Sequence, residues 1–191
     1  MNTAPWLIVG LGNPGPQYEA TRHNIGAMAC DVLGERVGGR FSQHKRGRAD
    51  VIEGRLSGVR VVIAKPRSFM NESGGPVKAL ADFYKTPLAQ LVVLHDELDL
   101  PFANQRYKLG GGDNGHNGLK SIRSAMGSGD YLRVRLGIGR PPGRQDPADF
   151  VLRPFGSTER KDLGVFLERA ADGIEVLVSA GLARAQNEYN D

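Results

Sequence analysis

Short apolar runs and amphipathic segments alternate along the first half of this chain. Apolar runs at residues 6–9, 59–64 and 91–94 are typical of strands that are covered on both faces of a sheet. Between them, apolar residues recur at spacings of three and four over residues 25–33 and 77–84, which predicts two helices with one buried face each. Alternating strands and helices indicate an α/β protein with a largely parallel sheet.

The second half of the chain continues this pattern. Residues 131–138 alternate apolar side chains with Arg133 and Arg135, so we predict a strand with one wet, basic face. The segment that starts at Ser157, a candidate N-cap, predicts one long helix that ends before Gly181. The Pro/Gly-rich residues 139–143 leave only about 50 residues after them, which is marginal for a second core. We therefore predict one α/β domain over residues 1–191, with a mixed, largely parallel twisted sheet and helices on both faces.

Composition narrows the class of protein. The chain has 191 residues, of which 40% are hydrophobic, and no apolar run approaches the roughly 20 residues that a membrane span needs. A single cysteine excludes an internal disulfide framework, no zinc-binding spacing is present, and a reducing, cytoplasmic setting fits best. The net charge of +4 permits a polyanionic partner without requiring one.

Glycine is over-represented, with 26 residues clustered at a few turns. The segment Gly10–Gly15 follows a predicted strand and fits the dinucleotide pattern G-x-G-x-x-G, which would indicate NAD binding. However, Pro14 and Pro16 interrupt the place where the phosphate-binding helix should begin, and no second strand ending in an acidic residue follows. We favour a tight turn that presents Asn13, and keep an NAD-dependent oxidoreductase as an alternative.

Polar segments follow the predicted strands, and ligands bind at strand ends in open α/β sheets. These segments are residues 18–24, 68–71, 95–99 and 110–118. No G-x-S-x-G elbow is present, and Cys30 falls inside a predicted helix, where a buried apolar role is favoured over a reactive thiol. Hydrolysis would then need an activated water, and the candidates are His23 as base, Asp96 as its partner, and the amides of Asn13, Asn71 and Asn117.

Each candidate also has a structural interpretation. His23 could cap the start of a helix, and Asn71 could cap the helix that begins near Gly75. Asp96 could be a solvated turn residue, and His116 could be a structural histidine. The basic cluster at residues 45–48 is interpreted as surface charge.

Five segments taken in order resemble the bacterial peptidyl-tRNA hydrolase family. They are G-L-G-N-P-G at 10–15, T-R-H-N at 21–24, F-M-N-E-S-G at 69–74, H-D-E-L-D at 95–99 and K-L-G-G-G-D-N-G-H-N-G-L at 108–119. The resemblance covers essentially the whole chain. It implies cleavage of the ester between a peptide and the terminal ribose of tRNA, which recycles tRNA released prematurely from ribosomes.

The resemblance also implies roles for individual residues. His23 corresponds to the general base, Asp96 to its carboxylate partner, and Asn13 to the residue that separates an N-blocked peptidyl group from a free aminoacyl amine. The residues implied to bind peptidyl-tRNA are Tyr18, Phe69, Asn71 and Asn117, with Lys108 and Arg135 as contacts for tRNA phosphates in the acceptor stem. The resemblance implies no metal and no organic cofactor. We also expect the protein to be a monomer.

Asp113 and Asn114 depart from the commoner form of the family's glycine loop, which leaves the path of the acceptor stem over that loop open. The main alternative is a non-catalytic RNA-binding or ribosome-associated module with the same basic surface. Such modules stack bases on interleaved aromatic residues, and at 7% aromatic residues this chain has no such stripe.

Overall fold

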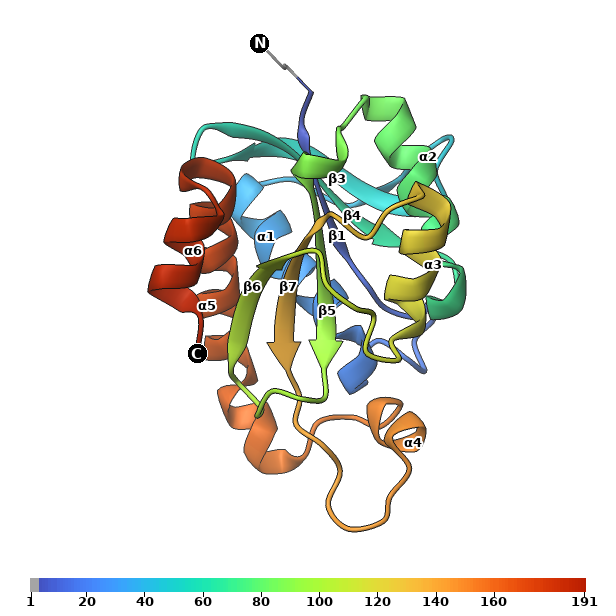
Figure 1. Ribbon diagram of the computed structural model, residues 1–191, viewed down its shortest axis with the longest axis vertical. Helices are drawn as coiled ribbons and strands as arrows, with labels where there is room; N and C mark the ends of the chain where they lie inside the picture. The colour runs from blue at the N-terminus through green and yellow to red at the C-terminus, as the bar shows by residue number, and fades with distance from the viewer. Residues whose placement is uncertain (1–3) are drawn as a thin grey trace.

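A seven-stranded sheet runs through the middle of the computed structural model, which describes residues 4–191 (Figure 1). The first three residues of the predicted 1–191 domain lie outside the described part. The strands are β1 (Trp6–Gly10), β2 (Ser42–Gln43), β3 (Ala49–Leu56), β4 (Val59–Pro66), β5 (Leu91–Glu97), β6 (Gln105–Leu109) and β7 (Leu132–Gly137). Their order is β2-β3-β4-β1-β5-β7-β6. The β4-β1-β5-β7 pairings are parallel and the outer pairings antiparallel, which confirms a mixed, largely parallel sheet.

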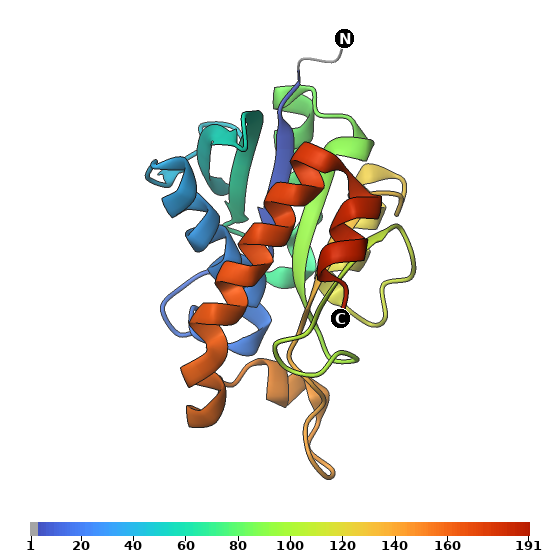
Figure 2. The same cartoon turned by 90° about the vertical axis from the view of Figure 1, so that its left-hand side faces the viewer.

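Helices cover both faces of this sheet, as predicted (Figures 1 and 2). One face carries α1 (Ile25–Val37), α5 (Ser157–Ala180) and α6 (Leu182–Tyr189), and the other carries α2 (Gly74–Tyr84) and α3 (Asn117–Met126). The short α4 (Pro147–Val151) lies beyond the C-terminal ends of β5 and β7. Three single-turn helices complete the fold: η1 (Arg22–Asn24), η2 (Met70–Glu72) and η3 (Leu88–Gln90). No helix within residues 4–191 is long and apolar enough to cross a membrane.

The central strand β5 shows why continuous apolar runs predicted the middle of the sheet. All seven of its residues are buried. Val92 and Leu94 pack into the core beneath α1 and α5, whereas Leu91 and Val93 pack into the core beneath α2 and α3. Each such side chain contributes about 1.5–3 kcal/mol by leaving water. Because side chains alternate between two covered faces, no polar position interrupts the run.

Two glycines bring α1 close to the strand ends that build the site. A Cβ atom on Gly26 would lie 2.2 Å from the backbone oxygen of Leu94, and one on Gly10 would lie 2.2 Å from the backbone oxygen of Gly26. Only glycine fits at either position, because real Cβ atoms do not approach oxygen so closely. The close packing of α1 places η1, just before it, beside the C-terminal end of β5.

The prediction of a wet, basic face on the strand at 131–138 was wrong for Arg133. Its side chain is buried and donates hydrogen bonds to the backbone oxygens of Gly112 (2.8 Å) and Gly129 (3.1 Å). The reason is that the glycine loop folds over this face of β7, and its carbonyl groups require buried donors. Arg135, two residues later, is half-buried.

Other boundaries also differ from the predictions. The long helix does begin at Ser157, but Gly156 is the N-cap, and the Glu159 carboxylate accepts a hydrogen bond from its N–H at 2.9 Å. Among the strands and α-helices, five were not predicted: β2, β3, β6, α4 and α6. Their patterns are short or mixed, so pairing and packing with distant residues decide their conformation. The amphipathic spacing of Leu119 and Ile122 does predict the helix α3.

Side chains from the end of the chain cover the outer edge of β6. The backbone N–H of Tyr107 donates to Oδ1 of Asn190 at 2.6 Å, and the Tyr107 carbonyl accepts from Nε2 of Gln186 at 3.0 Å. The backbone N–H of Asp191 donates to the carbonyl of Gln105 at 3.0 Å. The edge strand therefore has bonding partners on both sides.

Candidate active site

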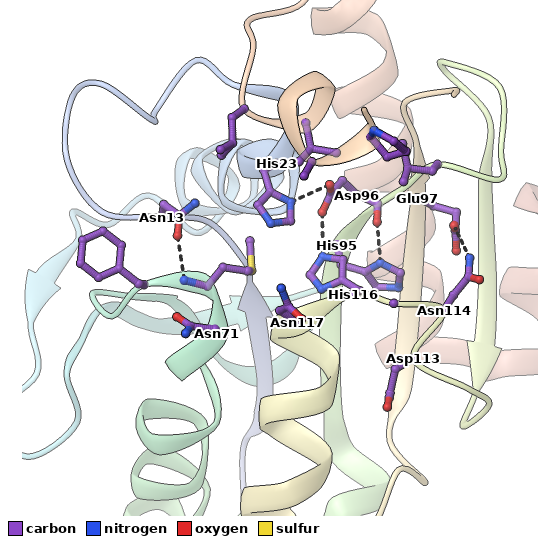
Figure 3. Close-up of a pocket in the computed structure, with 18 residues that line it drawn as sticks. Asn13, His23, Asn71, His95, Asp96, Glu97, Asp113, Asn114, His116 and Asn117 are labelled. Atoms are coloured by element: carbon purple, nitrogen blue, oxygen red, sulfur yellow. Dashed lines mark hydrogen bonds and ion pairs between the residues drawn. The ribbon is translucent and has the colours of Figure 1, made fainter. Parts of the chain in front are cut away.

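A cavity of about 490 Å³ opens at the C-terminal ends of the parallel strands (Figure 3). Six of the predicted site residues line it: Asn13, His23, Phe69, Asn71, Asp96 and Asn117. They come from five separate segments of the chain, as expected for ligand sites in open α/β sheets. The wall opposite β5 is apolar and comes from α4, with Pro147, Ala148, Val151 and Leu152.

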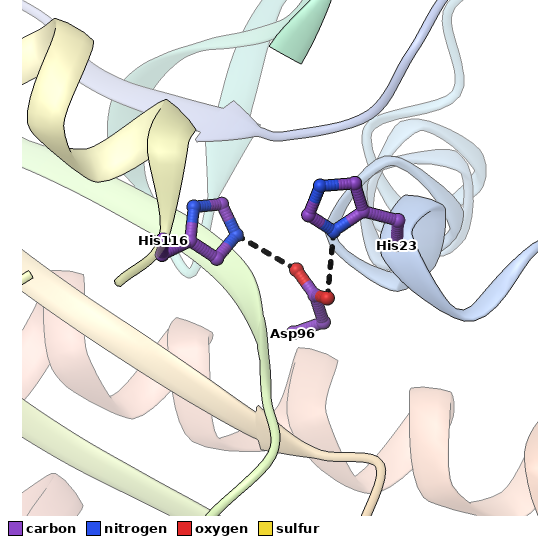
Figure 4. A group of neighbouring side chains, drawn as sticks. All are labelled: His23, Asp96 and His116. Carbon is purple, nitrogen blue, oxygen red and sulfur yellow. Dashed lines mark hydrogen bonds and ion pairs between the residues drawn. The ribbon is translucent and has the colours of Figure 1, made fainter. Parts of the chain in front are cut away.

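His23 and Asp96 meet across this cavity. Nδ1 of His23 lies 2.7 Å from Oδ2 of Asp96, and the two side chains are 15% and 3% exposed. Oδ1 of Asp96 lies 2.8 Å from Nε2 of His116, so one carboxylate joins two imidazoles (Figure 4). Because Asp96 occupies Nδ1 of His23, the remaining ring nitrogen, Nε2, is left to meet a ligand. The interpretation of Asp96 as a solvated turn residue is wrong.

Burial and charge set the ionisation of this group. Burial by itself would raise the pKa of Asp96, but the electrostatic attraction and hydrogen bonds of His23 and His116 outweigh it and hold the Asp96 pKa well below its usual range. Burial lowers the pKa of His23, whereas the charge and hydrogen bond of Asp96 raise it, and the balance is a raised pKa. The carboxylate is thus an anion in the pH range where His23 exchanges its proton.

Three hydrogen bonds with Asn24 and Met70 hold Asn13 in place. Its backbone N–H donates to Oδ1 of Asn24 (2.9 Å), and its carbonyl accepts from Nδ2 of the same residue (3.0 Å). Its own Oδ1 accepts from the backbone N–H of Met70 at 2.7 Å. These bonds fix the orientation of the Asn13 amide and leave its Nδ2 as the group that can donate to a ligand. The sequence analysis missed Asn24, whose side chain is buried.

Asn71 and Asn117 stand on the side of the cavity formed by η2 and α3. Asn71 belongs to η2, and Asn117 is the first residue of α3. The interpretation of Asn71 as a helix cap is wrong, because α2 begins at Gly74 with Ser73 as its N-cap. Among residues 4–191, neither amide side chain bonds to another protein group, so both can bind substrate.

An aromatic pair forms the rim near Asn13. The rings of Tyr18 and Phe69 meet edge to face with their centroids 6.4 Å apart, and Phe69 is 53% exposed. Tyr18 does not line the cavity itself. The predicted binding residue Tyr18 therefore packs against Phe69 at the entrance and lies outside the cavity that His23 lines.

Lys108 and Arg135 lie in a neighbouring hollow of about 350 Å³. This hollow shares His95, Glu97, Asp113 and Asn114 with the larger cavity, so the two spaces are adjacent. Nε of Arg135 pairs with Oε1 of Glu97 at 2.9 Å. The predicted phosphate contacts therefore lie in a different space from His23, and the two spaces share part of their walls.

Comparisons with known proteins are consistent along the whole chain. The family model described as peptidyl-tRNA hydrolase matches residues 7–191. This chain belongs to the peptidyl-tRNA hydrolase family. A peptidyl-tRNA hydrolase from Frankia casuarinae is 62% identical, with 97% of this chain and 94% of that protein aligned. One from Streptomyces coelicolor is 60% identical, with 98% and 96% aligned. The crystal structure of peptidyl-tRNA hydrolase from Acinetobacter baumannii matches with a TM-score of 0.91 at 31% identity, covering 100% of this chain and 98% of that one.

In this family member, the potential metal ligands act as a hydrogen-bonded chain. His23, Asp96 and His116 form a set whose ligand atoms lie within 4.8 Å of one another. However, Nδ1 of His116 accepts from the backbone N–H groups of Gly118 (3.1 Å) and Leu119 (3.3 Å), so the ring proton is on Nε2. That nitrogen donates to Asp96 and offers no lone pair to a cation. The donor set suits proton transfer better than metal binding.

Two other features of the family member bear on its chemistry. Cys30 is buried, and burial raises the pKa of its thiol, which makes it an inert core residue. The residues after Gly15 form turns, and the next α-helix begins only at Ile25. No helix N-terminus lies at the glycine run to hold a pyrophosphate, so the dinucleotide alternative loses its structural basis.

Proposed function

We propose that this chain hydrolyses the ester bond between a peptide and the 3′-terminal ribose of tRNA, using a water activated by His23. The single observation that carries the mechanism is the bond from His23 to the buried Asp96 carboxylate, which leaves Nε2 of His23 as the basic atom. Family membership supplies the substrate class. The reaction returns free tRNA from peptidyl-tRNA that ribosomes have released early.

The catalytic cycle moves one proton in and out of His23. Nε2 takes a proton from water as the oxygen attacks the ester carbonyl, and Asp96 stabilises the resulting imidazolium through Nδ1. The amide N–H groups of Asn71 and Asn117 orient the peptide and the 3′ end, and one of them donates to the developing oxyanion. When the intermediate collapses, the ribose oxygen leaves with the proton from Nε2. No metal or organic cofactor is required for these steps.

The fixed amide of Asn13 supports selection of N-blocked substrates. Its Oδ1 is occupied by the Met70 N–H, so the substrate meets a donor, Nδ2. A peptidyl group offers a carbonyl oxygen near the ester, which accepts from this donor. A free aminoacyl group offers an ammonium, which is also a donor and is disfavoured at the same place.

The hollow beside the cavity supports binding of the acceptor stem. Lys108 and Arg135 would contact phosphates there while the 3′ end reaches His23. Asp113 and Asn114, where the sequence departs from the commoner glycine loop, belong to the shared wall. We further propose that the protein acts as a monomer in the cytoplasm, where ribosomes release the substrate.

The test compares two tRNA substrates that differ at one amine. Wild-type protein should cleave N-acetyl-aminoacyl-tRNA and leave free aminoacyl-tRNA largely intact, measured by release of the labelled amino acid. His23→Ala should lower turnover by about 10²–10⁴-fold, the usual contribution of a general base, with unchanged melting temperature and tRNA affinity. Tight tRNA binding without cleavage of either substrate would instead favour the non-catalytic RNA-binding module.

A further inference from the structure

His116 connects the start of α3 to the Asp96 carboxylate. Its Nδ1 accepts from the backbone N–H groups of Gly118 and Leu119, the first turn of α3, at 3.1 and 3.3 Å. Its Nε2 lies 2.8 Å from Oδ1 of Asp96, and the side chain is 9% exposed. Both ring nitrogens are thus in use, on opposite sides of the ring (Figure 4).

The helix start determines which nitrogen carries the proton. Two N–H donors face Nδ1, so this atom must be unprotonated, and the neutral ring carries its hydrogen on Nε2. A second proton on Nδ1 would displace both backbone donors and would face the positive end of the α3 dipole. His116 is therefore held as a hydrogen-bond donor to Asp96.

The surroundings also hold the ring in place. A Cβ atom on Gly118 would lie 3.0 Å from Cε1 of His116 and 2.7 Å from the sulfur of Met70, so the ring packs directly against the glycine. The rings of His23 and His95 flank it, with centroids at 5.1 and 5.3 Å. Rotation of His116 away from Asp96 would require these neighbours to move.

We propose that His116 is a positioning residue that limits the basicity of His23 by sharing the negative charge of Asp96. This proposal rests on the proposed role of His23 as general base. Asp96 gives one oxygen to each histidine, so the bond from His116 fixes the rotation of the carboxylate that presents Oδ2 to His23. It also withdraws charge from the carboxylate, which weakens the hold of Asp96 on a protonated His23.

A limit on basicity serves catalysis because a general base works best when its pKa lies near the working pH. Asp96 alone, buried and with a single partner, would hold His23 as imidazolium over a wider pH range. The charge-sharing bond from α3 leaves more of the enzyme with a free Nε2 at neutral pH.

The other ionisable groups near His23 do not take over this role. Arg22 of η1 pairs with Glu159 at 3.0 Å, Asp149 of α4 is exposed, and Glu97 of β5 pairs with Arg135. His95, behind His116, is buried, which is the main reason that its pKa is lowered to about 4. It is uncharged at neutral pH. Asp96 and His116 are left as the groups that set the proton affinity of His23.

The test is the pKa of His23 in the substrate-free enzyme, measured by NMR titration of its ring carbon-bound protons. In His116→Asn, the asparagine still caps α3 but is too short to donate to Asp96. We expect the acid dissociation constant of the His23 imidazolium to fall about ten-fold, which corresponds to a pKa higher by about one. The acid limb of the kcat/KM profile should move in the same direction. His116→Ser, which also caps, is the second variant.

His44 offers a matched control. Its Nδ1 also accepts from two backbone N–H groups, those of Arg46 and Gly47, but it contacts no residue of the cavity. His44→Asn should leave the His23 pKa unchanged. An unchanged or lower His23 pKa in both His116 variants would overturn the proposal, even if turnover fell. A His23→Ala enzyme that kept its turnover would overturn the base assignment instead, while the NMR result would stand.

Discussion

Asp96 accepts a hydrogen bond from each of two histidines while almost fully buried, and its charge raises the pKa of His23. The direction in which this charge shifts the His23 pKa can be tested with Asp96→Asn. Removing the negative charge leaves burial as the main influence on His23, and burial lowers its pKa. The acid limb of the pH–rate profile should therefore move to lower pH. Turnover should fall by about 10²–10⁴-fold because the ring loses its orientation and the support for its imidazolium form. An acid limb that moved to higher pH would contradict this assignment.

Asn24 is a second residue whose effect is exerted through a neighbour. Asn24→Asp keeps the oxygen that accepts from the Asn13 N–H but replaces the Nδ2 donor with an oxygen that faces the Asn13 carbonyl. A lost buried hydrogen bond costs about 1–3 kcal/mol. We expect kcat/KM for N-acetyl-aminoacyl-tRNA to fall by roughly 5- to 100-fold, and its preference over free aminoacyl-tRNA to shrink. Asn187→Asp, on the exposed side of α6, should change neither quantity.

Among individual residues, the sequence predicted those proposed to act on the substrate better than those that hold them in position. His23, Asp96 and Asn13 were candidates because they follow predicted strands, where open α/β sheets bind ligands, and because a histidine, a carboxylate and an amide suit the activation of water. Asn24 and His116 were missed or given a structural role, since their function depends on contacts with residues 11 and 20 positions away. His116 does both: it caps α3 and bonds Asp96.

The packing of α1 on β5 makes a prediction about stability. In Gly26→Ala the new methyl group would lie 2.2 Å from the Leu94 oxygen, so the helix must shift. Overpacking of this kind costs about 1–3 kcal/mol, and activity should fall as well because α1 carries η1. In Gly164→Ala, at an exposed position of α5, no atom lies within 4 Å of the new carbon. That variant should gain about 0.5–1 kcal/mol from helix propensity. Thermal unfolding should therefore show a lower melting temperature for Gly26→Ala and a higher one for Gly164→Ala.

The elements that the sequence predicted are those whose own residues determine them. The first four residues of β5 are all apolar because both of its faces are covered, and α1 and α2 have a clear apolar stripe. β3 contains Glu53 and Arg55, and β6 has only two apolar residues, so neither resembles a buried strand. Antiparallel pairing with β4 and β7 makes them strands, and such pairing cannot be deduced from their composition.

At the scale of the whole molecule, Lys108 and Arg135 are the positive charges that we propose to bind tRNA phosphates. If Lys108 neutralises a tRNA phosphate, Lys108→Ala should raise KM and reduce the slope of log affinity against log salt by about one. Arg135→Ala should do the same, and it also leaves the buried Glu97 without its ion-pair partner. Arg55→Ala removes an equal charge at the far end of β3 and should leave the slope unchanged. A slope unaffected by Lys108→Ala would indicate an ordinary solvated surface.

The predicted basic face shows what a charge pattern cannot decide. Arg133 and Arg135 are equivalent in the sequence, and both line the hollow. However, Arg133 is buried and donates to the carbonyls of Gly112 and Gly129, whereas Arg135 is half-buried and pairs with Glu97. The difference arises because the loop at residues 110–118 and the turn before β7 supply acceptors for Arg133, whereas β5 supplies one for Arg135. Likewise, the separation of Lys108 from His23 into adjacent spaces depends on the path of that loop.

The bonds along the outer edge of β6 also bear on how this protein behaves when concentrated. Exposed strand edges recruit other strands and so promote aggregation. Here Asn190 and Gln186 occupy the free groups of Tyr107, and the opposite edge, β2, is two residues long and followed by the basic residues 45–48. Neither edge offers a foreign strand a template. Refolding from denaturant should therefore give the single-chain species even at high concentration, which light scattering after size-exclusion chromatography would verify.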